Sequence, residues 1–275
     1  LQIGDIMRGS GVGKIIESKH PDYSVGMHVL GGFGWQEYSV SNGKNTPLRP
    51  VPEDVSLPAT LGLFGTTGLT AYFGLLDLGE PKSGDTVVVS GAAGATGSVA
   101  GQIARIKGCR VIGIAGSADK CAWLKNKLNF DEVINYKTED VGERLDALCP
   151  DGINVYFDNV GGDILDLALA RIAHNARIVI CGGISRYNKV DNGPVPGPVN
   201  YFNLVYRRAR MEGFIVLDYA AQFEDAIREM RIWVKSGELK HAEDIVNGFE
   251  NLPQALMRLF EGKNTGKQMV CVAED

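Results

Sequence analysis

A run of small residues after a valine-rich stretch is the first feature with chemical meaning. Residues 90–98 read SGAAGATGS, so the glycines follow a GxxGxxG spacing rather than the commoner GxGxxG. Small side chains let a phosphate approach the backbone, and a following helix offers unpaired N–H groups and a positive dipole end. The segment therefore predicts the pyrophosphate site of a dinucleotide, and a plain flexible turn is the alternative. The residues expected at this site are Gly91, Ala93, Gly94, Ala95, Thr96 and Gly97.

The end of the next predicted strand indicates which dinucleotide binds. Proteins specific for NAD usually place an acid there, about 20 residues beyond the glycines, to hold the ribose 2′-hydroxyl. Here no acid ends the strand, and Gly116 and Ser117 leave room for a 2′-phosphate that Lys120 can neutralise. Asp119 lies past the turn, where we expect it to cap a helix. The pattern favours NADP over NAD, and a solvated helix residue is the alternative interpretation of Lys120.

These residues need a scaffold that brings strand ends together, and the middle of the chain predicts one. From residue 85 onward, apolar β-branched runs alternate with segments whose apolar residues recur at helical spacing. This alternation predicts an α/β fold, a doubly wound parallel sheet of the Rossmann type. The strands are expected at 86–90, 110–115, 132–136, 153–157, 176–181 and 213–217, and the helices at 98–107, 118–129, 141–148, 163–172, 201–210 and 222–235.

The two ends of the chain do not share this alternation. The first 60 residues contain glycine-rich breaks and short strand-like runs at 13–18 and 37–40, which predict an antiparallel β region with turns. Residues 244–249, 252–261 and 268–272 predict a strand, a helix and a strand. We expect these last elements to return to the β-rich first part of the chain.

Composition and charge exclude several classes of function. The 275-residue chain has a net charge of −5 and a pI of about 5.5, which argue against a surface for nucleic acid. No run of 18 apolar residues predicts a membrane span, and no signal peptide is recognisable. The five cysteines form no CxxC pair, as in a reduced, cytoplasmic protein. The chain opens on Leu1 rather than Met, so we expect its natural start to lie upstream.

The histidines do not predict a metal site. A catalytic zinc needs three Cys, His, Asp or Glu ligands at suitable positions. None of His20, His28, His174 and His241 has metal-ligand spacing to a cysteine. We therefore predict no metal, and a zinc-type alcohol dehydrogenase is disfavoured.

Seven motifs spread over the chain together resemble one family. They are Gly65–Leu75 (GTTGLTAYFGL), Val89–Gly101 (VSGAAGATGSVAG), Gly108–Ser117 (GCRVIGIAGS), Val155–Gly162 (VYFDNVGG), Cys181–Asn188 (CGGISRYN), Arg210–Phe214 (RMEGF) and Gly262–Val270 (GKNTGKQMV). With them the chain resembles the zinc-independent medium-chain dehydrogenase/reductases. Within this family it is similar to the leukotriene B4 12-hydroxydehydrogenase/15-oxoprostaglandin 13-reductase group, which includes curcumin-reductase-like members.

The resemblance implies a second domain beside the Rossmann domain. Residues 1–62 and 246–275 would form a GroES-like, β-rich catalytic domain, and residues 63–245 the NADP-binding Rossmann domain. Family members carry a further N-terminal segment before the stretch that matches Met7–Gly13, and that segment includes an active-site tyrosine. We therefore expect the GroES-like domain of this chain to be N-terminally incomplete.

The resemblance also implies a reaction, the NADPH-dependent reduction of the C=C double bond of α,β-unsaturated ketones and aldehydes without zinc. Hydride adds to the β-carbon, and a hydrogen-bond donor must stabilise the enolate oxygen that forms. Tyr187 matches the family tyrosine beside the nicotinamide ribose and the substrate carbonyl, and a neutral phenol can donate such a bond. A tyrosine that only packs at the mouth of the loop is the alternative.

Further contacts with the cofactor follow from the same resemblance. Lys120 and Tyr136 match positions that contact the 2′-phosphate. The other positions implied to bind the cofactor are Asn159, Cys181, Gly182, Tyr187, Phe214, Val216 and Asn264. Cys181 is expected to pack against the cofactor rather than to act as a nucleophile, because no histidine pairs with it. Core packing is the alternative for Phe214 and Val216.

Two other functions stay open from the residues alone. A zinc-free quinone reductase shares the fold and the cofactor and differs in the electron acceptor. A non-catalytic NADPH-binding protein would bind the cofactor without turnover, which an incomplete N-terminal domain makes credible. Family members are commonly homodimers, so a homodimer with a small-molecule enone or enal substrate is expected.

Overall fold

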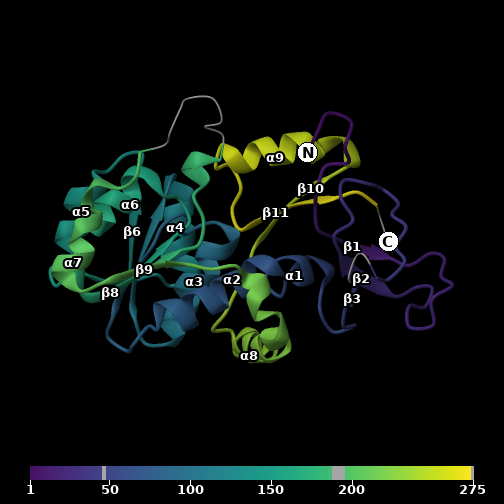
Figure 1. Cartoon of the computed structure of the whole chain (residues 1–275), viewed down its shortest axis with the longest axis horizontal. Helices are drawn as coiled ribbons and strands as arrows, with labels where there is room; N and C mark the ends of the chain where they lie inside the picture. Colours follow the sequence, from purple (N-terminus) through teal and green to yellow (C-terminus); the bar gives the residue numbers. More distant parts are fainter. Residues whose placement is uncertain (45–47, 188–195, 274–275) are drawn as a thin grey trace.

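A large parallel sheet forms the centre of the molecule (Figure 1). The computed structural model describes residues 1–44, 48–187 and 196–273, and within them the strands of this sheet run in the order β6-β5-β4-β7-β8-β9. The order reverses between β4 and β7, so the predicted doubly wound Rossmann fold is confirmed. The strands are β4 (Thr86–Val89), β5 (Arg110–Ala115), β6 (Glu132–Asn135), β7 (Ile153–Asp158), β8 (Ile172–Ile180) and β9 (Arg210–Gly213).

Helices cover both faces of this sheet and create two separate hydrophobic cores. Alternate residues of β4 enter different cores, with Val87 and Val89 in one and Val88 in the other. Burial on both faces explains why the strands are continuous apolar runs. The first core includes residues of α2 (Thr66–Phe73), α3 (Ala95–Ile106), α4 (Ala118–Lys127) and α8 (Phe223–Ser236), and the second those of α5 (Val141–Leu148), α6 (Gly162–Leu169) and α7 (Asn203–Arg207).

Two smaller sheets lie to one side of the large sheet (Figure 1). β1 (Gly11–Lys14), β2 (His28–Gly31) and β3 (Arg49–Pro50) pair antiparallel, which confirms a β-rich start of the chain. β10 (Glu243–Asn247) and β11 (Lys267–Cys271) pair in parallel, joined through η5 (Phe249–Asn251) and α9 (Leu252–Phe260). The predicted strand, helix and strand of the tail are therefore confirmed, and in the described part of the chain β10 and β11 form a two-stranded sheet of their own.

A helical segment that the residue pattern did not predict connects the small sheet to the large one. α1 (Leu57–Leu61) begins after Ser56, whose hydroxyl accepts a hydrogen bond from the Ala59 N–H at 3.3 Å. After α2 the chain continues without a break into a π-helix, η1 (Gly74–Gly79). π-helical turns are rare in proteins overall, and those that occur often lie at functional sites.

The prediction for the edge of the large sheet was wrong. The helix expected at 201–210 is a 3₁₀ turn, η3 (Val199–Phe202), followed by the short α7, which ends at Arg208 in the left-handed region with φ 50°. The edge strand therefore begins at residue 210, and the strand expected at 213–217 is instead an irregular segment that leads into the 3₁₀ helix η4 (Val216–Gln222). Phe214 and Val216 of this segment pack against α2 rather than in a ladder, whereas Ile215 and Leu217 are exposed.

Three further boundaries differ from the prediction. Residues 37–40 form no strand in the structure. α3 begins at Ala95, so that Ala95, Thr96 and Gly97 belong to its first turn rather than to the loop. β8 begins at Ile172, where a helix end was expected, and Ile172 already pairs with Ile153 of β7. A register shift against β7 and the left-handed Asn175 then interrupt the regular pairing. Among the described residues, no helix is both long and apolar enough to cross a membrane.

Candidate active site

The glycine loop has the shape that a bound phosphate requires. Gly91 has φ +57°, a left-handed conformation that favours glycine. A Cβ on Gly97 would lie 2.5 Å from the Gly91 carbonyl oxygen, and one on Gly94 would lie 3.2 Å from the same atom. No described side chain caps the first turn of α3. The loop is therefore closed by backbone contacts that side chains would obstruct, and the open helix end fits a pyrophosphate.

A second group of predicted residues meets at the ends of β5 and β6. A Cβ on Gly116 would lie 2.8 Å from the Tyr136 hydroxyl oxygen, so only glycine lets this ring lie across the strand end. The Ser117 hydroxyl caps α4 by accepting a hydrogen bond from the Lys120 N–H at 3.3 Å. Ser117 thus holds the position expected for Asp119, which lies in the first turn of the helix instead. The predicted 2′-phosphate residues are brought together here.

Lys120 supplies the positive charge of this corner. Its Nζ donates a hydrogen bond of 2.7 Å to the Gly262 carbonyl oxygen, which ties α4 to the tail of the chain. Burial lowers the pKa of Lys120, and the charge of Lys137 lowers it further, whereas Asp244 raises it. Lys137 was missed by the sequence analysis, although it directly follows Tyr136 at the end of β6. A cation at a neighbouring strand end is the signal that could have found it.

A buried carboxylate organises the loops on the other side of the glycines. Asp158, at the end of β7, is fully buried. It accepts hydrogen bonds from the Ser90 hydroxyl at 2.7 Å, the Tyr156 hydroxyl at 3.1 Å and the Gly161 N–H at 3.0 Å. A buried charge is tolerated when it is hydrogen-bonded in this way. The sequence analysis also missed Asp158 and Ser90 as site residues. The position of Asp158 directly before Asn159 is the one signal that could have found this carboxylate.

Asn159 joins the two strands at which the sheet order reverses. Its Nδ2 donates a hydrogen bond of 2.7 Å to the Ser90 carbonyl oxygen, and its N–H donates one of 2.9 Å to the Ser90 hydroxyl oxygen. Its own carbonyl oxygen accepts a hydrogen bond of 3.2 Å from the Ile184 N–H. Asn159 therefore links the end of β4 to the loop after β8, at the edge where dinucleotides bind.

Cys181 and Gly182 follow β8 at the same edge. Their N–H groups donate hydrogen bonds of 2.9 and 3.0 Å to the Asp158 carbonyl oxygen. Burial raises the pKa of the Cys181 thiol to about 12, with a smaller contribution from the Asp158 charge. Since the thiolate is the nucleophilic form, this cysteine is suited to packing rather than to covalent chemistry.

Tyr187 lies in the loop after β8. Its side chain is exposed, and its hydroxyl oxygen accepts a hydrogen bond of 3.2 Å from the Gly183 N–H, after the short 3₁₀ helix η2 (Ile184–Arg186). The hydroxyl hydrogen is thereby free to point elsewhere. Asn188, the last residue of the matching motif, lies outside the described residues.

The residues predicted to flank the nicotinamide come from the segment after β9. Phe214 is half-buried and packs with Val216, which is buried, against α2. Asn264 comes from the tail and is buried; its Nδ2 donates a hydrogen bond of 2.9 Å to the Gly266 carbonyl oxygen. The Gly266 N–H in turn donates one of 2.8 Å to the carbonyl oxygen of Ala93 in the glycine loop.

Together the predicted residues occupy the carboxyl edge of the large sheet and the loop that reaches it from the tail. The glycine loop lies after β4, the Lys120–Tyr136 corner after β5 and β6, and the remaining groups after β7, β8 and β9. A ligand that spans this edge would place its phosphates at the centre and its two ends on opposite sides. Among the residues that the structure describes, no three His, Cys, Asp or Glu side chains are grouped to hold a metal ion.

Known proteins share this arrangement. A family model described as zinc-binding dehydrogenase matches residues 95–231, and one described as N-terminal domain of oxidoreductase matches residues 1–48. The chain is 42% identical to the NADPH-dependent curcumin reductase of Escherichia coli, over all of this chain and 80% of that protein. It is 44% identical to prostaglandin reductase 1 of Oryctolagus cuniculus, over 97% of this chain and 77% of that protein.

A solved structure extends the likeness to three dimensions. CurA from Vibrio vulnificus in complex with NADPH superposes with a TM-score of 0.91 at 40% identity, and the match covers 98% of this chain and 80% of that one. The likeness therefore includes both the large sheet and the smaller sheets around it. The chain belongs to the medium-chain dehydrogenase/reductase family, in the group of the curcumin and prostaglandin reductases.

Proposed function

We propose that this protein is an NADPH-dependent ene reductase that reduces the C=C double bond of α,β-unsaturated ketones and aldehydes. The observation that carries the proposal is the meeting, at one sheet edge, of a glycine loop, a basic corner without an acid, and an exposed tyrosine hydroxyl. Relatives named for NADPH-dependent reduction of curcumin and for prostaglandin reduction support the substrate class. Enones and enals share the conjugated carbonyl group that this site would polarise.

The cofactor would lie along the carboxyl edge of the large sheet. The glycine loop would hold the pyrophosphate, and Lys120 and Tyr136 the 2′-phosphate, with Lys137 as a second cation. Asn159, Cys181, Gly182, Phe214, Val216 and Asn264 would contact the remaining parts. When bound, NADPH supplies the hydride that adds to the β-carbon of the substrate.

Tyr187 would stabilise the enolate that the hydride transfer creates. Because its hydroxyl oxygen already accepts the Gly183 N–H, the hydroxyl hydrogen can point toward a substrate oxygen. A donor placed where negative charge develops stabilises the transition state more than the ground state. Water at this exposed edge can then provide the proton for the α-carbon. We propose that this chemistry is zinc-independent, since the tyrosine donor serves the carbonyl oxygen in place of a Lewis acid.

We further propose that the protein works as a homodimer in the cytoplasm. Support for the dimer comes from β9, whose residues are all exposed and whose outer edge pairs with no described strand. An unprotected edge invites pairing with another chain. Exposed apolar side chains lie around it, at Val199, Tyr201, Phe202, Val205, Tyr206, Met211, Ile215 and Leu217. Support for a reducing compartment comes from the cysteines, which are all free.

The domain division is proposed in the same way. Residues 1–62 with 246–275 would form the GroES-like domain, and residues 63–245 the Rossmann domain. The three-stranded antiparallel sheet and the β10–β11 pair, which lie to the same side of the large sheet, support this division (Figure 1).

A panel of acceptors tests the proposed function. Purified protein is mixed with NADPH and, in separate reactions, an enone, an enal and a quinone, and the loss of NADPH absorbance is followed. We expect turnover with the enone and the enal at a kcat/KM at least about tenfold above that of the quinone. Preference for the quinone would favour a quinone reductase. Cofactor binding without turnover of any acceptor would favour a non-catalytic NADPH-binding protein.

A further inference from the structure

The π-helix η1 has contacts that the cofactor site does not explain. It extends α2 by six residues, Gly74–Gly79. It contacts the segment 210–219, which comprises β9 and the start of η4. That segment includes Phe214 and Val216, and we call Phe214–Val216 the nicotinamide wall because of its proposed place beside the nicotinamide. The π-helix and segment 210–219 are joined at three points along their lengths.

The first contact is between Gly74 and the wall itself. A Cβ on Gly74 would lie 2.4 Å from Phe214 Cζ, so the absence of a side chain lets the phenylalanine ring lie directly against the helix backbone. Val216 is buried in the same small core, with Phe73 and Leu69 of α2. The wall is therefore packed from behind by α2 and the first residue of η1.

The second contact is a hydrogen bond directly behind the wall. The Tyr219 hydroxyl donates to Asp77 Oδ2 at 2.5 Å, and the Tyr219 ring stacks on Phe73 with centroids 4.5 Å apart. Partial burial and the hydrogen bond to Asp77 raise the pKa of Tyr219 to about 12, so the hydroxyl stays protonated and able to donate. Only two residues separate Tyr219 from Val216, so this bond limits how far the wall can move.

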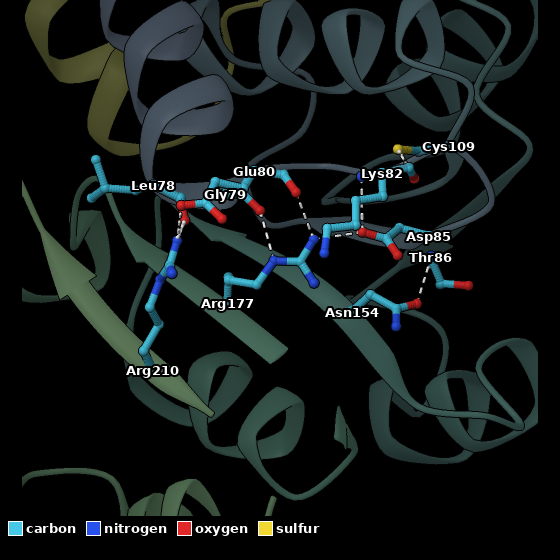
Figure 2. Close-up of polar contacts among 10 residues, drawn as sticks. All are labelled: Leu78, Gly79, Glu80, Lys82, Asp85, Thr86, Cys109, Asn154, Arg177 and Arg210. Atoms are coloured by element: carbon cyan, nitrogen blue, oxygen red, sulfur yellow. Dashed lines mark hydrogen bonds and ion pairs between the residues drawn. The ribbon is translucent and has the colours of Figure 1, made fainter. Parts of the chain in front are cut away.

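The third contact fixes the start of β9 at the far end of η1 (Figure 2). Arg210 donates a hydrogen bond of 2.7 Å to the Leu78 carbonyl oxygen and pairs with the Glu80 carboxylate at 2.9 Å. From β8, Arg177 donates to the carbonyl oxygens of Gly79 and Glu80 at 2.9 and 2.8 Å. These guanidinium groups satisfy carbonyl groups that a helix end leaves unpaired. η1 is thereby anchored to the sheet.

We propose that Asp77 and Tyr219 are positioning residues for hydride transfer, which hold the nicotinamide wall against the π-helix. The inference rests on the proposed function, because it needs the nicotinamide beside Phe214–Val216. Neither side chain would touch the cofactor. Their hydrogen bond acts through the wall, so it should affect the orientation of the nicotinamide more than the affinity for NADPH, which depends mainly on phosphate contacts at the other strand ends.

Two matched tyrosine variants test this role. Tyr219→Phe keeps the aromatic stack and removes the hydroxyl. Tyr72→Phe is the control, because Tyr72 also donates a 2.5 Å hydrogen bond to a carboxylate, that of Glu229. This bond joins α2 to α8 and includes no residue of segment 210–219. For Tyr219→Phe we expect kcat with an enone to fall about fivefold, the size of one lost hydrogen bond, and the dissociation constant of NADPH to change less than about twofold. Tyr72→Phe should leave kcat unchanged.

The acceptor side of the bond gives an independent test. Asp77→Asn keeps an amide oxygen that can accept from Tyr219, so it should retain most of the activity, whereas Asp77→Ala should lose as much as Tyr219→Phe. The double variant Asp77→Ala/Tyr219→Phe should lose no more than either single variant, because both remove the same bond. The fluorescence of the bound nicotinamide, measured for each variant, reports its surroundings without turnover.

The outcomes separate this inference from the proposed function. Changed nicotinamide fluorescence in Tyr219→Phe but not in Tyr72→Phe would support the positioning role. It would do so even if the wild-type protein reduced no enone, and that lack of turnover would overturn only the proposed function. Equal changes in the two tyrosine variants, additive losses in the double variant, or weakened NADPH binding with unchanged kcat would each overturn the positioning role.

Discussion

At the scale of single residues, charge placement explains how the site would distinguish its cofactor. Lys120 lies in the first turn of α4, and Lys137 follows the end of β6 closely enough to lower the pKa of Lys120. Together the two cations would neutralise a 2′-phosphate. The Gly116 position shows the same selection by shape, since a Cβ there would strike the Tyr136 ring. Charge and shape at this corner thus favour NADPH over NADH.

Replacing Lys120 should test the corner directly. Lys120→Ala should raise the dissociation constant of NADPH about tenfold or more, the size of a lost charge-assisted hydrogen bond, and change that of NADH less than about twofold. Because the pKa of Lys120 is lowered, its charge is lost at a lower pH than that of an exposed lysine. As pH rises, the preference for NADPH over NADH should therefore weaken before exposed lysines lose their charge. Titration of both cofactors by fluorescence across pH checks this.

The control for Lys120 lies on the same helix. Lys125→Ala removes an exposed cation that pairs with Glu132 at 3.2 Å, away from the corner. It should affect neither cofactor. Equal losses for NADPH and NADH in Lys120→Ala would remove this lysine from the 2′-phosphate site.

In the proposed mechanism, Tyr187 acts in the chemical step rather than in cofactor binding. Tyr187→Phe should lower kcat with an enone about 10- to 100-fold and leave the affinity for NADPH nearly unchanged. We expect less than the largest effects of lost oxyanion donors, because water can reach this exposed position and donate a hydrogen bond instead. Tyr201→Phe, at an equally exposed tyrosine outside the predicted site, is the matched control. Unchanged turnover in Tyr187→Phe would contradict the donor role.

At the scale of elements, the site depends on how closely backbone segments approach. The glycine loop and the first turn of α3 touch through carbonyl and Cα atoms, and the buried Asp158 joins the ends of β4 and β7 by hydrogen bonds. The tail reaches this point as well, through the Gly266 N–H and the Ala93 carbonyl oxygen. A change in any of these segments should move the proposed phosphate site as a whole.

Gly97→Ala tests this close approach. The added Cβ would meet the Gly91 carbonyl oxygen at 2.5 Å and Ala92 Cα at 2.9 Å, both of them backbone atoms that cannot turn away. We expect about 1–3 kcal/mol of lost stability, measured by thermal unfolding, and NADPH binding weakened at least about tenfold. Gly32→Ala, where a Cβ meets nothing within 4 Å, should be nearly neutral. Full NADPH affinity in Gly97→Ala would show that the loop is not the phosphate site.

At the scale of the whole molecule, the exposed edge of the large sheet determines how copies would associate. β9 ends the strand order in the described part of the chain, and the apolar side chains of η3 and α7 lie just before it in sequence. Pairing two such edges would continue the sheet across a two-fold axis and cover apolar surface on both copies.

A charge in β9 should break this association. Met211→Lys places a cation in the edge strand, a common natural protection against pairing, and should convert a dimer to a monomer in light scattering after gel filtration. NADPH binding should be retained. Met257→Lys, at an exposed position of α9, is the control and should stay dimeric. A wild-type protein that is monomeric at high concentration would exclude the dimer.

The parallel sheet, the glycine loop and the preference for NADP could all be predicted from the sequence, because they follow from local periodicity and from residue types at strand ends. Only the tertiary structure revealed the buried Asp158 network, the second cation Lys137, the true start of β9 and the π-helix behind the wall. The bond between Ser90 and Asp158 joins residues 68 positions apart, and that between Asp77 and Tyr219 joins residues 142 apart. Such contacts leave no periodic trace in the chain, since they exist only once packing has brought distant strand ends and helices together.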